Sequence, residues 1–141
     1  MYLKTEASKI TLSAFPGPSG SGVLHVLECA KVLPFTVDRV FTVTGMAAGS
    51  RRGGHANMIV NECVVCLHGA VQLTLTDGSG AVTHHLLSTP QDSVLIPAGT
   101  WADLEALADN TAYMVLADCS YETASLHYER DISHFLARGR L

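Results

Sequence analysis

The sequence predicts an all-β protein, a jelly-roll barrel followed by a short C-terminal helix, and three observations lead to this prediction. Short runs rich in β-branched and aromatic residues recur along the chain. Clusters of Gly, Pro, Ser and Asp separate these runs at intervals of about 8–12 residues, a spacing typical of sandwiches and barrels. A helical stripe of apolar residues is found near the C-terminus. Many short strands with one terminal helix favour a jelly roll.

The individual elements follow from local patterns. Residues 15–22 read as a loop because Gly, Pro and Ser dominate them. Asp77-Gly78-Ser79-Gly80 is a hairpin turn signal. Residues 131–138 form the one expected helix, since an Asp suited to capping precedes its apolar stripe. The expected strands cover residues 23–29, 37–43, 62–68, 71–76, 81–87, 93–96 and 112–117.

Composition indicates a single globular domain over residues 1–141. The chain has 48% hydrophobic and 16% charged residues, which allows one substantial core. The formal net charge is −4 and the only basic cluster is Arg51-Arg52, so nucleic acid is a poor candidate partner. No apolar run reaches the ~18 residues that span a bilayer, and the charged N-terminus does not resemble a secretory signal. We therefore expect a cytoplasmic protein with no membrane partner.

The four cysteines, Cys29, Cys63, Cys66 and Cys119, are expected to be free thiols in a reducing compartment. Cys63 and Cys66 form a C-x-x-C pair inside an apolar run. Residues three apart on a strand point to opposite faces, so this pair is unsuited to binding one metal ion. We interpret both as small buried hydrophobes.

The most informative segment surrounds a single histidine. Gly49, His55, Glu62 and Gly69 fall on the spacing of the first cupin barrel motif, which reads G, five residues, H-x-H, three or four residues, E, six residues, G. Asn57 stands at the second histidine position. His55 and Asn57 are two apart and share one face of a strand, so we expect both to face a ligand cavity. The alternative is a core histidine hydrogen-bonded to an asparagine.

The second cupin motif, P-x-G-x-x-H, bears on metal binding. Pro97 and Gly99 match it, but Ala102 stands at its histidine position. A metal cupin needs about three histidines and a carboxylate around one ion. Since only His55 and Glu62 remain, we expect no metal.

With these residues the sequence resembles the sugar 3,4-ketoisomerases of the WxcM-like cupin family, which act on dTDP-4-keto-6-deoxyglucose. The resemblance covers most of the chain. It implies a homodimer that exchanges N-terminal strands, a dTDP-sugar or related small molecule as ligand, and no cofactor. The blocks that carry it are Pro34-Phe35, Arg39-Val40-Phe41, Arg52-Gly53-Gly54-His55-Ala56, Val64-Val65-Cys66-Leu67-His68-Gly69, Ile96-Pro97-Ala98-Gly99-Thr100-Trp101, Met114-Val115-Leu116-Ala117-Asp118 and Tyr128-Glu129-Arg130.

The resemblance also implies a reaction of deoxysugar biosynthesis. A base removes the proton next to the C4 ketone, an enediol forms, and the proton returns at C4 to leave a C3 ketone. His55 is the expected acid and base, and Arg52 the expected donor to the enediolate oxygen. Trp101 is a candidate for stacking on thymine or sugar, or a rim residue that covers the barrel mouth. The expected substrate-binding residues are Asn57, Glu62, Trp101, Arg39, Tyr128 and Arg130.

The sequence departs from the family at its reactive centre. Asn57 cannot accept a proton near pH 7. Met58 replaces a usual lysine, and the segment 19–22 lacks an expected D-x-R-G pattern. Three interpretations remain: an isomerase with His55 as the only proton shuttle, a sugar-nucleotide or small-ligand binding cupin with no or altered activity, and a variant in which the asparagine traps a ligand. A structural interaction protein is a further class. The expected function is a 3,4-ketoisomerase, and whether the chain is an active enzyme stays open.

Overall fold

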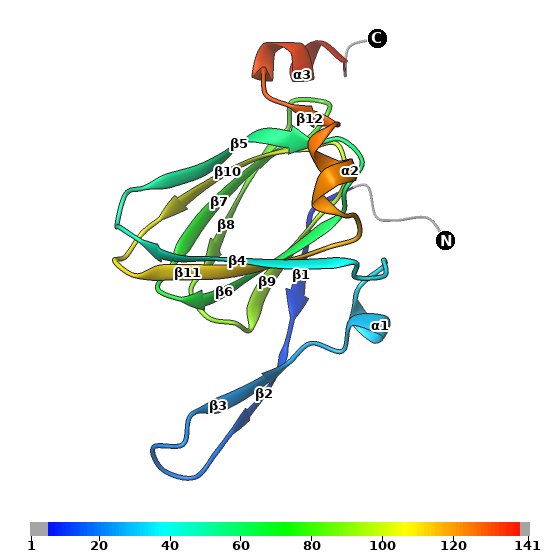
Figure 1. Cartoon of the computed structure of the whole chain (residues 1–141). Coiled ribbons are helices and arrows are strands. Elements are labelled where there is room, and N and C mark those ends of the chain that lie inside the picture. The colour runs from blue at the N-terminus through cyan, green and yellow to red at the C-terminus, as the bar shows by residue number, and fades with distance from the viewer. Residues whose placement is uncertain (1–5, 139–141) are drawn as a thin grey trace.

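Two facing antiparallel sheets form a barrel, and a hairpin projects from it (Figure 1), in a computed structural model that describes residues 6–138. The strand order is β1-β9-β6-β11-β4 in the first sheet and β12-β5-β10-β7-β8 in the second. The first sheet contains β1 (Ser8–Thr11), β4 (Arg39–Met46), β6 (Glu62–His68), β9 (Asp92–Ile96) and β11 (Thr111–Ala117). The second contains β5 (Arg51–Asn57), β7 (Val71–Thr76), β8 (Val82–Leu87), β10 (Thr100–Ala106) and β12 (Tyr128–Glu129). The remaining elements are the hairpin strands β2 (Ser13–Pro16) and β3 (Val23–Val26), and the helices α1 (Cys29–Val32), α2 (Tyr121–Ser125) and α3 (Ile132–Arg138).

The expected all-β architecture with a C-terminal helix is confirmed. The strands expected at residues 62–68 and 71–76 have those bounds in the structure. The strand expected over 23–29 is too long, because β3 ends at Val26 and α1 begins at Cys29. Two short helices, α1 and α2, were not expected, since four or five residues are too few to show a helical period. No helix within residues 6–138 is long and apolar enough to cross a membrane.

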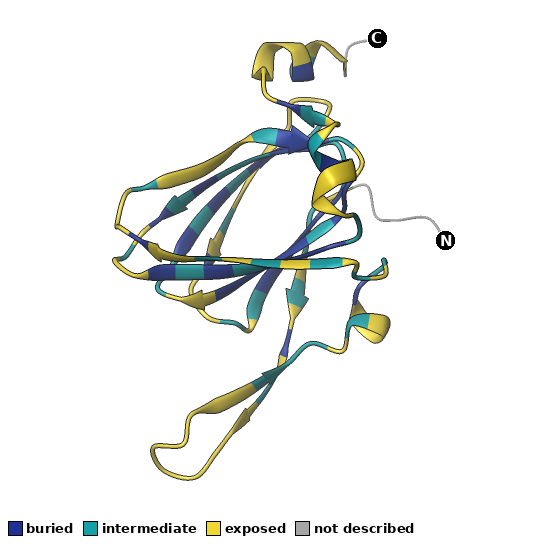
Figure 2. Ribbon diagram, in the orientation of Figure 1, coloured by how far each residue is buried: buried dark blue, intermediate teal, exposed yellow. Residues whose placement is uncertain are grey.

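Both faces of β6 are buried, which explains its continuous apolar sequence. Val64 and Cys66 belong to the core between the sheets, whereas Cys63 and Val65 pack on the other face under Leu12 and its neighbours from the N-terminal segment. The expectation that the two cysteines of the C-x-x-C pair point to opposite faces is confirmed. Figure 2 shows this burial concentrated in the barrel strands, while the far end of the β2–β3 hairpin is exposed.

A bulge in β5 determines which residues face the barrel interior. Ala102 of β10 pairs with His55, and the next residue, Asp103, pairs with Gly53, so Gly54 is an extra residue in β5. Residues three apart on a regular strand face opposite sides. Because of the extra residue, Arg52 and His55 both face inward.

Gly53 lies closest to the opposite strand at this bulge. Its φ is +90°, and a Cβ at this position would lie 2.6 Å from the carbonyl oxygen of Ala102. Gly49 has a similar φ of +82°, but a Cβ added there would meet no heavy atom within 4 Å. An alanine at either position would therefore have the same unfavourable positive φ, but only at Gly53 would its Cβ clash with the backbone.

We expect Gly53→Ala to lower the free energy of unfolding by about 2–4 kcal/mol, because a left-handed backbone and a backbone clash act together. Gly49→Ala, the matched control, should lower it by only about 1 kcal/mol. Urea unfolding followed by circular dichroism measures both. Equal losses of unfolding free energy for the two variants would show that the close approach at Gly53 does not contribute to stability.

Candidate functional site

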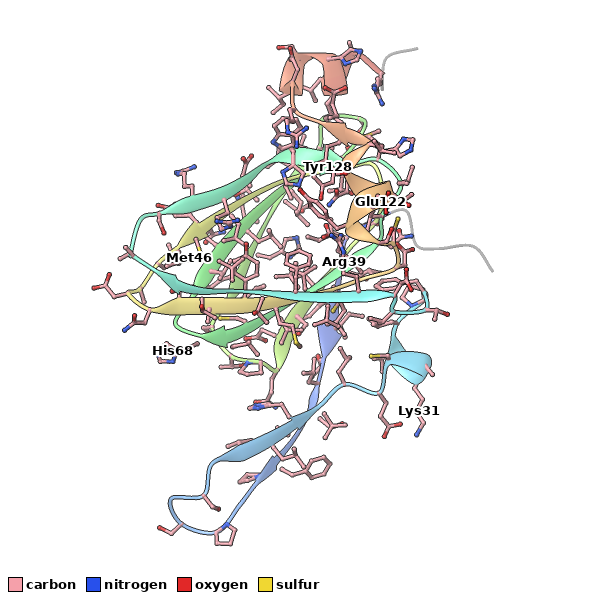
Figure 3. All side chains as sticks on the ribbon, viewed as in Figure 1. Lys31, Arg39, Met46, His68, Glu122 and Tyr128 are labelled. Carbon is pink, nitrogen blue, oxygen red and sulfur yellow. The ribbon has the colours of Figure 1, made fainter. Side chains whose placement is uncertain are left out.

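A cavity of about 570 Å³ lies between the two sheets. Figure 3 shows Arg39 and Tyr128 at the end of the barrel where α2 lies, on opposite sides of the space between the sheets. Apolar side chains such as Val64, Leu73 and Ile96 form part of the wall. The polar residues that line the cavity include Arg39, Arg52, His55, Asn57, Glu62, Tyr113 and Tyr128.

His55 presents a neutral imidazole to this cavity. Burial lowers its pKa below the ordinary histidine value; a backbone hydrogen bond with Gly53 opposes the shift, and the charge of Arg130 adds to it. The imidazole ring stacks on Tyr128 with 4.7 Å between ring centroids and 27° between planes. A neutral imidazole held in a fixed orientation is suited to accept a proton near pH 7.

Asn57 and Glu62 form a hydrogen-bonded pair beside His55. The Asn57 Nδ2 atom donates to Glu62 Oε1 over 2.7 Å. Burial raises the pKa of the Glu62 carboxyl, and the Asn57 hydrogen bond and the Arg39 charge oppose the rise. Asn57 Oδ1 is buried with no hydrogen-bond partner among the described residues. A ligand hydroxyl would satisfy this acceptor.

Arg39 places a guanidinium at the cavity wall. Its Cζ atom lies 5.2 Å from the Phe41 ring centroid and 5.7 Å from that of Tyr121. Its Nε and Nη2 atoms are buried and have no hydrogen-bond partner within the described part of the chain. Buried donor atoms without partners are unfavourable in the free protein, so these two are suited to bind ligand oxygens.

A second guanidinium, from Arg52, reaches the cavity because of the β5 bulge. It lies close to Tyr113, whose pKa is raised by burial while the charge and hydrogen bond of Arg52 oppose the rise. The cavity therefore combines one neutral base, one carboxyl and two cations. This set can bind an anionic, hydroxyl-rich ligand and move protons on it.

Trp101 does not line the cavity, in contrast to its expected stacking role. Because Ala102 faces inward opposite His55, its neighbour Trp101 faces outward. The indole Nε1 donates to Asp103 Oδ2 over 3.0 Å, and its ring centroid lies 5.9 Å from that of Phe135 in α3. Trp101 therefore anchors the C-terminal helix to the outside of the barrel.

Arg130 is also absent from the cavity wall. It is exposed, and its Cζ atom lies 5.2 Å from the Tyr128 ring centroid. The structure thus brings Arg39, Arg52, His55, Asn57, Glu62 and Tyr128 together and leaves Trp101 and Arg130 outside the lining.

The sequence analysis missed three aromatic residues of the wall: Phe41, Tyr113 and Tyr121. Phe41 is two residues from Arg39, and Tyr113 is two from the core residue Val115, so strand alternation would have indicated both. Tyr121 had no such signal, because it begins the short helix α2.

The donor set does not fit a transition metal. His55 and Glu62 supply only two side-chain ligands among the described lining residues, and Asn57 already donates to one carboxylate oxygen of Glu62. Within residues 6–138, no three His, Cys, Asp or Glu side chains come together as a metal site.

Comparison with known proteins yields matches in both sequence and fold. A TDP-4-oxo-6-deoxy-alpha-D-glucose-3,4-oxoisomerase from Aneurinibacillus thermoaerophilus is 26% identical over 114 residues, which cover 81% of this chain and 80% of that protein. A 3,4-ketoisomerase from Helicobacter canadensis has the same fold with a TM-score of 0.84 and 20% identity, covering 96% of this chain and 98% of that one.

A third match is a histidine-to-asparagine mutant of the 3,4-ketoisomerase QdtA from Thermoanaerobacterium thermosaccharolyticum, solved in complex with TDP-4-keto-6-deoxyglucose. Its TM-score is 0.85 at 19% identity, covering 98% of this chain and 96% of that one. The family described as FdtA, WxcM-like, C-terminal, matches residues 7–140. The resemblance seen in the sequence is thereby confirmed, and the chain belongs to this WxcM-like family.

Proposed function

We propose that the protein is a nucleotide-sugar 3,4-ketoisomerase that acts on a dTDP-4-keto-6-deoxyhexose. The observation that carries the proposal is a neutral His55 in a polar cavity of about 570 Å³ that is also lined by two guanidinium groups, Arg52 from the same strand and Arg39 from the opposite sheet. A family relative is named as an oxoisomerase for the corresponding TDP-sugar. The reaction moves protons between adjacent carbons and oxygens, so it needs no redox cofactor.

The proposed roles follow from position. His55 removes the proton at C3 and returns it at C4, and Tyr128 holds the imidazole plane by stacking. Arg52 stabilises the developing enediolate oxygen. Arg39 offers its two unpaired donors to substrate oxygens, and Asn57 Oδ1 accepts from a sugar hydroxyl. Trp101 and Arg130 have no part in the proposed contacts.

A second candidate function is a binding protein that holds a nucleotide-sugar without converting it. Asn57 at the position of a family histidine favours this alternative, because an amide cannot take up a proton near pH 7. A related ketoisomerase with a histidine-to-asparagine change was solved with its keto-sugar bound. Turnover separates the two functions, since both require ligand binding.

Incubation with dTDP-4-keto-6-deoxyglucose in deuterated water tests the proposal by NMR. We expect a 3-keto product that carries solvent deuterium at a carbon of the sugar. His55→Ala should lower kcat by about 10²–10⁴-fold, because it removes the acid and base. His84→Ala, a histidine on β8 outside the cavity, should leave kcat unchanged.

Calorimetric titration with dTDP completes this test. His55→Ala should still bind dTDP, since the proposed phosphate and sugar contacts remain. If wild-type protein binds dTDP but yields neither product nor deuterium incorporation, the isomerase proposal is wrong and the binding-protein alternative is supported. If wild-type protein shows neither binding nor turnover, both the isomerase and the binding-protein functions are wrong, and a structural interaction protein is the remaining class.

We also propose that the protein is a cytoplasmic homodimer that exchanges its N-terminal hairpin with a second copy. The β2–β3 hairpin projects from the barrel, and three of its large apolar side chains are exposed, with Phe15 at 56%, Val23 at 49% and Leu24 at 63%. Apolar surface of this kind is typical of an association site. The four free thiols are suited to a reducing compartment.

Sedimentation velocity measures the proposed assembly. We expect wild-type protein to sediment as a dimer and the double variant Phe15→Ser/Leu24→Ser to sediment as a monomer, because it loses apolar area at the interface. Leu126→Ser is the matched control, since Leu126 is 77% exposed and lies outside the hairpin. A monomeric wild-type protein, or a dimer unaffected by the double change, would contradict the proposed exchange.

A further inference from the structure

Glu62 occupies a chemically distinct position in the cavity. Among the described residues that line the wall, it is the one carboxyl group. Its Oε1 atom accepts from Asn57 Nδ2, and Asn57 shares the inward face of β5 with His55. The carboxyl therefore lines the same cavity as the proposed base and is held in place by an amide that does not titrate.

The proposed isomerisation moves two protons. The carbon proton passes from C3 to C4, and a hydroxyl proton leaves O3 while another arrives at O4. A single imidazole occupied with the carbon proton cannot simultaneously serve the oxygens. A second group that both donates and accepts a proton is therefore required near the sugar oxygens.

The two arginines, Asn57 and Tyr113 do not meet this requirement. Arg39 and Arg52 remain charged at working pH, and Asn57 is an amide that does not titrate. Burial raises the pKa of the Tyr113 hydroxyl, which disfavours its loss of a proton. Among the carboxyl and imidazole groups of the described wall, Glu62 is the one that the proposed role of His55 leaves available.

The surroundings of Glu62 favour a protonated carboxyl. Burial is the largest influence and raises its pKa, and the charge of Asp118, which follows β11, raises it further. Asn57 and Arg39 oppose the rise. A protonated histidine at position 57 would form an ion pair with Glu62 and keep the carboxyl ionised. The neutral amide of Asn57 donates only a hydrogen bond, which favours ionisation less. Burial raises the pKa of the neighbouring Tyr113 hydroxyl, and the charge of Glu62 raises it further, so this group stays neutral.

We propose that Glu62 is a catalytic acid and base of the cavity, which transfers the hydroxyl proton between the two sugar oxygens while His55 transfers the carbon proton; this inference rests on the proposed isomerase activity. In the first step His55 takes the C3 proton, the electron pair forms the C3–C4 double bond, and Glu62 gives its proton to O4. The products are an enediol, an imidazolium and a carboxylate.

The second step reverses these roles. The Glu62 carboxylate takes the O3 proton, the C3 ketone forms, and C4 receives the proton from the His55 imidazolium. Both side chains return to their starting states, and no oxidant, reductant or co-reactant is consumed. Arg39 stabilises the transient carboxylate, since its charge favours ionisation of Glu62.

Substitution at Glu62 tests the inference with dTDP-4-keto-6-deoxyglucose as substrate. Glu62→Gln keeps the side-chain volume and an oxygen for Asn57, so we expect a kcat at least about 100-fold lower with KM and dTDP affinity nearly unchanged. Glu62→Asp keeps a carboxyl and should recover at least about tenfold of the loss. Glu105→Gln, a β10 carboxyl paired with Arg51 outside the cavity, is the matched control and should retain wild-type kcat.

The pH dependence of kcat/KM distinguishes proton transfer from positioning. We expect wild-type activity to fall on the acid side as His55 gains a proton and on the alkaline side as Glu62 loses one. Glu62→Gln should lack the alkaline fall that belongs to this carboxyl. If Glu62→Gln retains more than a tenth of wild-type kcat, or keeps the alkaline fall, the inference is overturned while the isomerase proposal stands. A wild-type protein without turnover overturns both.

Thermal unfolding gives a readout that does not depend on activity. A carboxyl whose pKa is higher in the folded state binds more protons when folded, so stability decreases as pH rises from the unfolded-state pKa through the folded-state pKa. We expect Glu62→Gln to have a higher Tm than wild type at pH 8 and the difference to shrink toward pH 4. A difference that does not grow with pH would mean that Glu62 is an ordinary carboxylate, which contradicts the inference.

Discussion

The arrangement of the site depends on the pairing of β5 with β10 at the bulge. Ala102 and Asp103 are consecutive in β10, yet they pair with His55 and Gly53, and the extra residue in β5 changes which side chains face inward. Without it, Arg52 would face the outside of the barrel and the cavity would lose a cation beside the base. The close approach of Gly53 to the Ala102 carbonyl holds this register, because a side chain there would push the strands apart.

The free protein keeps several polar groups in an unfavourable state inside the cavity. Two donor atoms of Arg39 and the Asn57 amide oxygen are buried without partners in the described chain, and burial disfavours the charged form of Glu62. Unsatisfied groups of this kind destabilise the fold by about 1–3 kcal/mol each. The apolar packing on both faces of β6 offsets that loss. The binding groups of the cavity are thus held ready for a ligand at some expense to the stability of the free protein.

Sequence reasoning predicted what depends on strand alternation and missed what depends on irregular geometry. The opposite faces of Cys63 and Cys66 and the shared face of His55 and Asn57 follow from a period of two. The β6 bounds follow from its continuous apolar run. The bulge breaks that period, so the sequence could not indicate how Arg52 and His55 lie relative to one another. Trp101 was expected at the ligand because of its family position. Its neighbour Ala102 faces inward, so strand alternation directs the indole outward. Contacts between strands far apart in the sequence, such as His55 of β5 with Tyr128 of the neighbouring β12, required the tertiary structure.

The outward position of Trp101 has a practical consequence, since it is the only tryptophan in the chain. The indole is 5% exposed and lies between the back of the ligand-bearing sheet and Phe135 of α3. Its fluorescence emission therefore reports whether the C-terminal helix is docked, and a bound ligand does not touch the chromophore directly. The protein contains an intrinsic optical probe that separates detachment of the tail from occupancy of the barrel.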